Sequence, residues 1–218
     1  MTLLKSLLYT IIFIVFLQVI TLWDLLDLVF GDDFKPYNYF AFVNGFLVLI
    51  PLMFYIKKTQ GFQSLKPAQT SLYFYPVAFI LGVGFIFMQM PLNGILNIVL
   101  GIDRAIFTSF QWSYNFHLNH LGFFLFTPIA EELFFRQIIQ KGLQQRYSGW
   151  IAILMSSALF ALMHLQLIFP FLGLDLHWHH AYITFFGGLI SAYLYQKSNS
   201  IGPSIVFHVA WNFSGLIF

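Results

Sequence analysis

Long apolar stretches, separated by short polar segments, recur along the whole chain. They lie at about 6–23, 38–56, 71–91, 118–140, 149–166, 181–196 and 203–218. A helix needs roughly 20 residues to cross the hydrocarbon core of a bilayer, and each stretch is close to that length. The pattern therefore predicts an all-α fold, a polytopic membrane bundle of seven transmembrane helices. Residues 92–117 hold a further apolar stretch broken by Asp103 and Arg104, so an interfacial helix or an eighth span is the alternative.

Composition supports a membrane protein and excludes several kinds of site. Hydrophobic residues make up 59% of the 218 residues and charged residues only 8%, whereas a soluble domain would need far more charge on its surface. The chain has no cysteine, which excludes a disulfide framework, a thiol nucleophile and a cysteine-based zinc site. A net charge of +2 without a basic run gives no indication of a nucleic-acid partner.

The basic residues predict an orientation. If the N-terminus is cytoplasmic, seven Lys and Arg residues fall in cytoplasmic segments, and two, Lys35 and Arg104, fall in the opposite loops. The positive-inside rule therefore predicts a cytoplasmic N-terminus. The small size of the chain favours a bacterial plasma membrane.

Three charged residues lie within the fourth predicted span, where a charge costs several kcal/mol. They are Glu131, Glu132 and Arg136. Glu132 and Arg136 are four residues apart, so we expect them to pair on one face of the helix. A structural ion pair explains these two as well as a function does. Glu131 is rotated by about 100° and is expected to face elsewhere. Without a partner in the sequence, it is predicted to be functional.

Two later spans carry polar groups as well. The fifth contains Phe160 and His164, and the last contains His208 and Asn212 on one helical face. A single histidine in a membrane span more often makes a hydrogen bond between helices, but three polar elements on three helices favour a shared site. A glutamate could take a proton from an attacking water, histidines could orient that water, and an amide could stabilise the oxyanion. The same atoms could instead hold a zinc ion with an open position, and both alternatives stay open.

These residues form three motifs that resemble those of a known family. Glu-Glu-x-x-x-Arg stands at Glu131 to Arg136, Phe-x-x-x-His at Phe160 to His164, and His-x-x-x-Asn at His208 to Asn212. In this order, on separate helices, they resemble the CPBP family of intramembrane endopeptidases. That family includes the type II CAAX prenyl endopeptidases and the bacterial Abi proteins. The resemblance covers about 118–218 and implies that this part is the catalytic core. Residues 1–117 would add accessory transmembrane helices within one structural domain.

The resemblance also implies a role for each motif residue. Glu131 would activate water, His164 and His208 would bind that water or a metal, and Asn212 would support the oxyanion. Glu132, Arg136 and Phe160 would shape the site. The implied activity is that of an intramembrane protease, either a glutamic-type endopeptidase or a metalloendopeptidase. The favoured glutamate mechanism requires no cofactor, and zinc held by His164, His208 and Glu131 is the alternative.

The expected partners are the lipid bilayer and a peptide or membrane-anchored protein substrate, either prenylated or of the leader type. A non-catalytic bacteriocin-immunity or membrane interaction protein is the main alternative function. A transporter with a proton relay is another, but it predicts internal repeats that the sequence lacks. Two further groups are assigned to structure: His177-Trp178-His179-His180 to the membrane interface, and Gly187-Gly188 to close helix packing.

Overall fold

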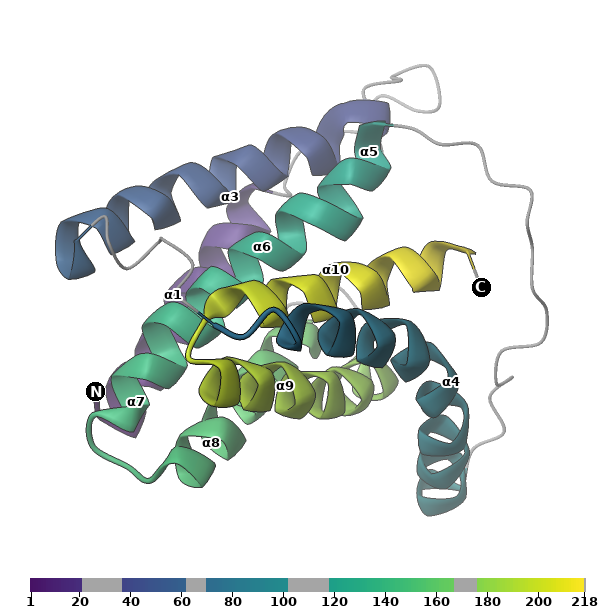
Figure 1. Ribbon diagram of the computed structural model, residues 1–218. Coiled ribbons are helices and arrows are strands. Elements are labelled where there is room, and N and C mark those ends of the chain that lie inside the picture. Colours follow the sequence, from purple (N-terminus) through teal and green to yellow (C-terminus); the bar gives the residue numbers. More distant parts are fainter. Residues whose placement is uncertain (21–36, 62–69, 102–117, 167–175, 218) are drawn as a thin grey trace.

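The computed structural model of the protein describes residues 1–20, 37–61, 70–101, 118–166 and 176–217 (Figure 1). Within these ranges the regular structure is helical, without strands, and the predicted all-α fold is confirmed. The single helices are α1 (Leu3–Ile20), α3 (Tyr37–Gln60), α4 (Phe74–Leu100), α8 (Gly149–His164), α9 (Trp178–Ser198) and α10 (Ile201–Ile217). Each of the seven predicted spans coincides with one of these helices or with the composite helix described next.

The fourth span is one continuous helical rod that contains two π-helical segments. Its segments are α5 (Leu118–Leu121), the π-helix η3 (Gly122–Phe126), α6 (Thr127–Glu132), the π-helix η4 (Leu133–Gln140) and α7 (Lys141–Gln144). π-helical turns within α-helices are rare and are found frequently at functional sites. The two glutamates of the first motif are the last residues of α6 and lie directly before η4. We refer to residues 118–144 as the central rod.

The outer surface is apolar, as expected for a surface that faces lipid. Of the described helices, α1, α4 and residues 41–60 of α3 are long and apolar enough to cross a membrane, and α8 and α10 are shorter apolar helices. Large apolar side chains point outward, with exposed fractions of 77% for Leu4 and 83% for Ile98. A soluble protein would not leave such a surface in water. The chain is an integral membrane protein.

Helix α4 decides part of the question about an eighth span. It continues past Pro91 to Leu100, so residues 92–100 extend the third span and do not form a separate helix. The helix bends sharply in its C-terminal half (Figure 1), as expected for a proline inside a helix, which removes a backbone hydrogen bond. Residues 102–117, the remainder of the ambiguous segment, lie outside the described residues.

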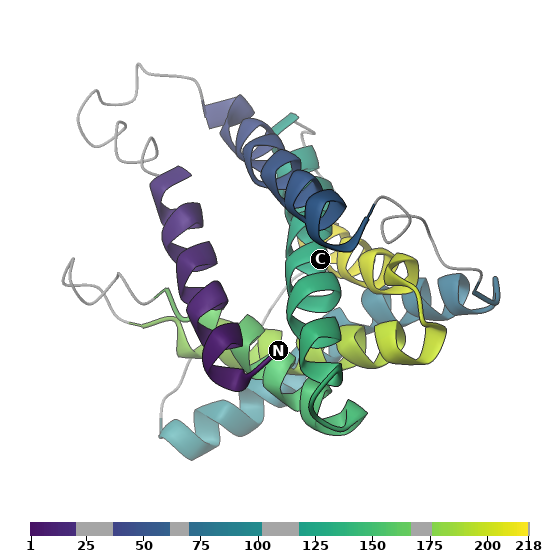
Figure 2. The same cartoon turned by 90° about the vertical axis from the view of Figure 1, so that its left-hand side faces the viewer.

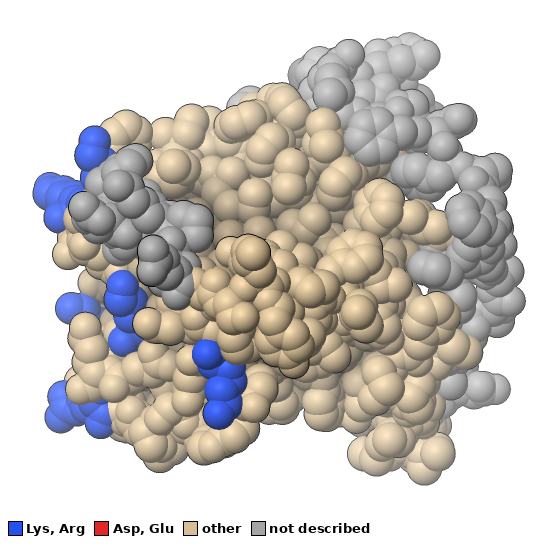
Figure 3. Space-filling view, in the orientation of Figure 1, with Lys and Arg blue, Asp and Glu red and all other residues tan. Residues whose placement is uncertain are grey.

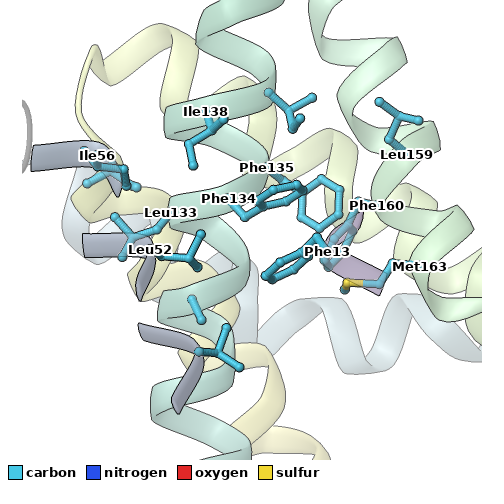
Figure 4. Close-up of a cluster of buried hydrophobic side chains, with 14 of the residues drawn as sticks. Phe13, Leu52, Ile56, Leu133, Phe134, Phe135, Ile138, Leu159, Phe160 and Met163 are labelled. Carbon is cyan, nitrogen blue, oxygen red and sulfur yellow. The ribbon is translucent and has the colours of Figure 1, made fainter. Parts of the chain in front are cut away.

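The larger hydrophobic core surrounds the central rod. Phe13 of α1 stacks on Phe134 of η4 with ring centroids 4.0 Å apart, and Phe135 contacts Phe160 of α8 edge to face at 5.1 Å (Figure 4). Leu52 and Ile56 of α3 complete the cluster on another side of the rod. Helices from both the predicted accessory and the predicted catalytic part therefore share one core.

The second core holds α4, α9 and α10 together through small residues. Gly82 of α4 lies so close to α10 that an added Cβ would meet the carbonyl oxygen of Phe207. Gly187 of α9 lies in the same way against the ring of Trp211, and Gly188 lies against Phe160. The prediction that Gly187 and Gly188 serve close helix packing is confirmed.

The described basic side chains, apart from the buried Arg136, gather at one end of the molecule (Figure 3). They are Lys5, Lys57, Lys58, Lys141, Arg146 and Lys197, at the start of α1 and near the ends of α3, α7 and α9. The acidic residues within the described part are Glu131 and Glu132, both buried. We call this end of the molecule the basic end. Lys35, Lys66 and Arg104, which also entered the orientation argument, lie outside the described residues.

The glycine contact predicts a specific loss of stability. In Gly82→Ala the new methyl group would meet backbone of α10, which has no freedom to move aside, so α4 must shift. We expect the free energy of unfolding to fall by about 1–3 kcal/mol, measured as a lower thermal midpoint in detergent. Gly84→Ala is the matched control, because its Cβ would meet nothing within 4 Å. Equal midpoints for the two variants would contradict the close packing of α4 on α10.

Candidate active site

The carboxylate of Glu132 is the centre of a buried polar network. Its Oε2 accepts from Nε of Arg136 at 2.9 Å and from the hydroxyl of Ser191 at 2.6 Å. Its Oε1 lies 2.9 Å from Nδ1 of His208. Glu132 is 1% exposed and Arg136 is fully buried. The predicted pairing of Glu132 with Arg136 is confirmed, and two further helices, α9 and α10, contribute to it.

His208 lies between the two glutamates. Because a carboxylate only accepts, the bond to Glu132 places a proton on Nδ1 of His208 and turns Nε2 the other way. That Nε2 lies 3.7 Å from Oε2 of Glu131. The expectation that Glu131 faces elsewhere is therefore wrong. Neighbouring residues are about 100° apart around a helix, but both side chains are long enough to reach one ring from its two sides.

Glu131 differs from Glu132 in having an unsatisfied carboxylate. It is 7% exposed, and within the described part of the chain it makes no hydrogen bond, only the 3.7 Å contact with His208. A carboxylate in this position is available to a water molecule or a substrate. Each carboxylate oxygen of Glu132, by contrast, accepts a hydrogen bond, so this side chain has a structural role.

Aromatic rings fix the two histidines. Trp211 stacks on the ring of His208 at 5.5 Å with an interplanar angle of 28°. Phe160 contacts His208 edge to face at 5.7 Å, contacts His164 at 4.6 Å, and lies under the guanidinium of Arg136 at 5.6 Å. The motif phenylalanine thus touches a residue from each of the three motifs.

His164 is the last residue of α8, and its orientation is set by its own helix. Its Nδ1 lies 2.9 Å from the carbonyl oxygen of Phe160, one turn earlier, so Nδ1 donates and Nε2 keeps its lone pair. Counted along the predicted spans, His164 and His208 would lie at different depths. The structure removes this difference by staggering α8 and α10, so that both rings contact Phe160.

Asn212 is on the same helix as His208, but its amide contacts a different group. Its Nδ2 donates to the carbonyl oxygen of Phe123 at 3.3 Å, in the first π-helical turn of the central rod. The amide has a second N–H, so a role toward an oxyanion stays a prediction. The contact ties α10 to the rod on the side away from the basic end.

The histidine cluster of residues 177–180 lies beside His164, although the sequence places it only at the membrane interface. The ring of His180 is 5.4 Å from that of His164, and Nε2 of His179 is 2.9 Å from Oδ1 of Asn97 on α4. A pocket of about 300 Å³ opens here. Its walls are Gln89, Asn93, His177, His179, His180 and Ile183.

The donor set gives no support for a bound metal. Within the described residues, no group of three His, Asp or Glu side chains is arranged to hold a metal ion. His164, His208 and Glu131 are not arranged as a three-ligand zinc site in this structure. A mechanism that needs no cofactor stays a prediction, to be tested on the purified protein.

Ser191 and Trp211 are among the residues of this site that sequence reasoning missed. Ser191 donates to Glu132 from α9, and nothing in its spacing relates it to the three motifs. Trp211 could have been found, because it follows His208 by three residues and so shares its helical face.

One of three comparisons with known proteins finds a match. Residues 112–214 match the family model described as type II CAAX prenyl endopeptidase Rce1-like. The matched segment contains all three motifs. No curated protein and no solved structure matches the chain.

The two glutamates are expected to respond differently to the same substitution. Glu132→Gln removes the charge that compensates the buried Arg136, so the free energy of unfolding should fall by about 3–5 kcal/mol. Glu131→Gln removes no hydrogen bond within the described structure and should leave the thermal midpoint in detergent nearly unchanged. An equal fall in the thermal midpoint of both variants would contradict the structural role of the Glu132 carboxylate and the availability of the Glu131 carboxylate.

Proposed function

Because residues 112–214 match the Rce1-like type II CAAX prenyl endopeptidase family model, we propose that this segment is an endopeptidase of that family and that Glu131 activates the water that cleaves the peptide bond. The proposed substrate is a membrane-associated peptide, either prenylated or of the leader type. One observation carries this proposal: two buried carboxylates converge on opposite nitrogens of one imidazole, and one of them, Glu131, lacks a hydrogen bond within the described residues.

The proposed first step takes place between Glu131 and His208. A water molecule fits within hydrogen-bond distance of both Oε2 of Glu131 and Nε2 of His208, because these atoms are 3.7 Å apart. Glu131 takes one proton of the water, and the lone pair on Nε2 accepts a hydrogen bond from the other. The water oxygen then attacks the carbonyl carbon and forms a tetrahedral intermediate.

The proposed second step returns the proton. The Glu131 carboxyl group protonates the peptide nitrogen, the C–N bond breaks, and the products are a carboxylic acid and an amine. His164, whose ring also contacts Phe160, makes its hydrogen bond through Nδ1, and its Nε2 would help to orient the water. The second N–H of Asn212 is the proposed donor to the oxyanion. Glu132 and Arg136 keep the ring of His208 in place.

The proposed orientation puts the basic end in the cytoplasm. The described exposed Lys and Arg residues lie at this end, as does the start of α1. The positive-inside rule then makes the N-terminus cytoplasmic. A site enclosed by helices suits a substrate that enters from the bilayer or its surface.

The proposed role of Glu131 predicts loss of cleavage without loss of fold. Purified protein in liposomes would be given a library of membrane-anchored fluorogenic peptides. Glu131→Gln should lower turnover by about 10²–10⁴-fold, the usual share of a general base, and His164→Ala should lower it as well. Lys197→Gln, on the exposed surface of α9, is the control and should stay active. Unchanged turnover in Glu131→Gln would defeat the proposal, and no cleavage by wild type across the library would favour an immunity or interaction role.

The metal-free form of the proposal has its own test. We expect wild-type protein to keep full turnover after dialysis against a chelator. We also expect zinc to be present at far less than one ion per chain by elemental measurement. Activity lost on chelation and restored by added zinc would replace the glutamate mechanism by a metal-assisted one.

A further inference from the structure

A groove made of two adjoining pockets runs between α1 and α3, on the side of the central rod away from His208. Two adjoining pockets form it, with volumes of about 430 and 590 Å³. Both are lined by Tyr9 of α1, Tyr55 of α3 and Ile138 of η4, so the two pockets adjoin at these residues, where the side chains of Tyr9 and Tyr55 are hydrogen-bonded to each other. Figure 2, seen from the basic end, shows α1 to the left of the central rod and α3 crossing its upper part, with a gap between α1 and α3.

The inner part of the groove is apolar. Beyond the two tyrosines its walls are Ile12, Phe13, Phe16, Pro51, Leu52 and Phe134. Several of these residues also face the outside of the bundle, and Ile12 is 57% exposed. In a membrane this part borders on hydrocarbon, and its surface suits an acyl chain.

The outer part of the groove is cationic and lies at the basic end. Lys5 and Lys141 line it from α1 and α7. Nζ of Lys141 donates to Oε1 of Gln60 at 3.0 Å, and Nζ of Lys5 lies 5.5 Å from the ring centroid of Tyr9. Both partners are neutral, so neither contact cancels the charge of the ammonium group. The acids within the described residues are the two buried glutamates, which do not line the groove.

The two tyrosines mark the boundary between the apolar and the cationic part. Tyrosine is enriched at the level of the lipid headgroups, where one end of the side chain is apolar and the other polar. The groove thus has apolar walls on one side of the tyrosines, and on the other side the ammonium groups of Lys5, Lys141 and the Met1 N-terminus, without an acidic partner among the described residues. Thr59, Gln60 and Gln145 add hydrogen-bonding groups to the cationic part.

We propose that this groove binds one anionic phospholipid. One acyl chain lies along Ile12, Phe16 and Leu52, and the phosphate lies between Lys5 and Lys141. Charge complementarity selects an anionic headgroup, since a zwitterionic lipid would bring a further cation to a site that is already cationic. The apolar part distinguishes a lipid from a free phosphate. The site is separate from Glu131 and His208, and the proposal does not rest on the proposed function.

Lipid retention measured by native mass spectrometry tests the proposal. Delipidated Glu131→Gln protein, which is expected not to cleave, would be given equal amounts of phosphatidylglycerol and phosphatidylcholine with the same acyl chains. We expect one phosphatidylglycerol per chain to be retained in preference. Lys5→Gln/Lys141→Gln should lower this retention at least about tenfold. Because the readout is binding, its outcome is independent of whether the wild type is a protease.

A charge-matched control separates lipid binding in the groove from the general attraction of an anionic lipid to the basic end. Arg146→Gln/Lys197→Gln removes the same charge from the same end, outside the groove, and should retain the lipid like its parent. Ile12→Trp narrows the apolar part without changing charge and should lower retention as well. Equal loss in both double variants, equal retention of the two lipids, or displacement by glycerol phosphate would each overturn the proposal.

Discussion

The position of the site depends on the burial of one charged group, the Glu132 carboxylate. A carboxylate removed from water costs several kcal/mol unless it is paired and its oxygens are hydrogen-bonded. Arg136 supplies the charge from the same helix, and Ser191 and His208 supply donors from α9 and α10. The bonds that offset the cost of burial are therefore the bonds that bring three helices together and set the rotation of the His208 ring.

This arrangement leaves some polar groups without partners. Glu131 carries a carboxylate without a hydrogen bond, and Nη2 of Arg136 and the hydroxyl of Ser157 also lack partners within the described structure. Such groups are costly in a buried position. Proteins keep costly groups mainly where function requires them. The carboxylate of Glu131, which lacks a hydrogen bond, faces Nε2 of His208. The proposed chemistry depends on this difference between Glu131 and Glu132.

Much of the fold follows from the sequence, because spans depend on length and hydrophobicity alone. The Glu132–Arg136 pair also follows, because helical spacing fixes it. The convergence of both glutamates on His208 does not follow. It depends on the length of the two glutamate side chains, on how α8 and α10 are shifted along each other, and on the change from α6 to the π-helix η4. No residue pattern in the sequence predicts that change. Ser191 could not be predicted for a similar reason. A single serine in an apolar span gives no sign of a role, and its hydrogen bond to Glu132 depends on the packing of two helices.

The central claim, that Glu132 holds His208 with Nδ1 protonated and Nε2 directed at Glu131, can be tested on the unmodified protein. Solid-state ¹⁵N NMR in lipid reports which nitrogen of an imidazole carries the proton, and a His208→Gln sample assigns the signal among the seven histidines. We expect a proton on Nδ1 of His208 and a bare Nε2 at neutral pH. A bare Nδ1 with the proton on Nε2 would contradict it.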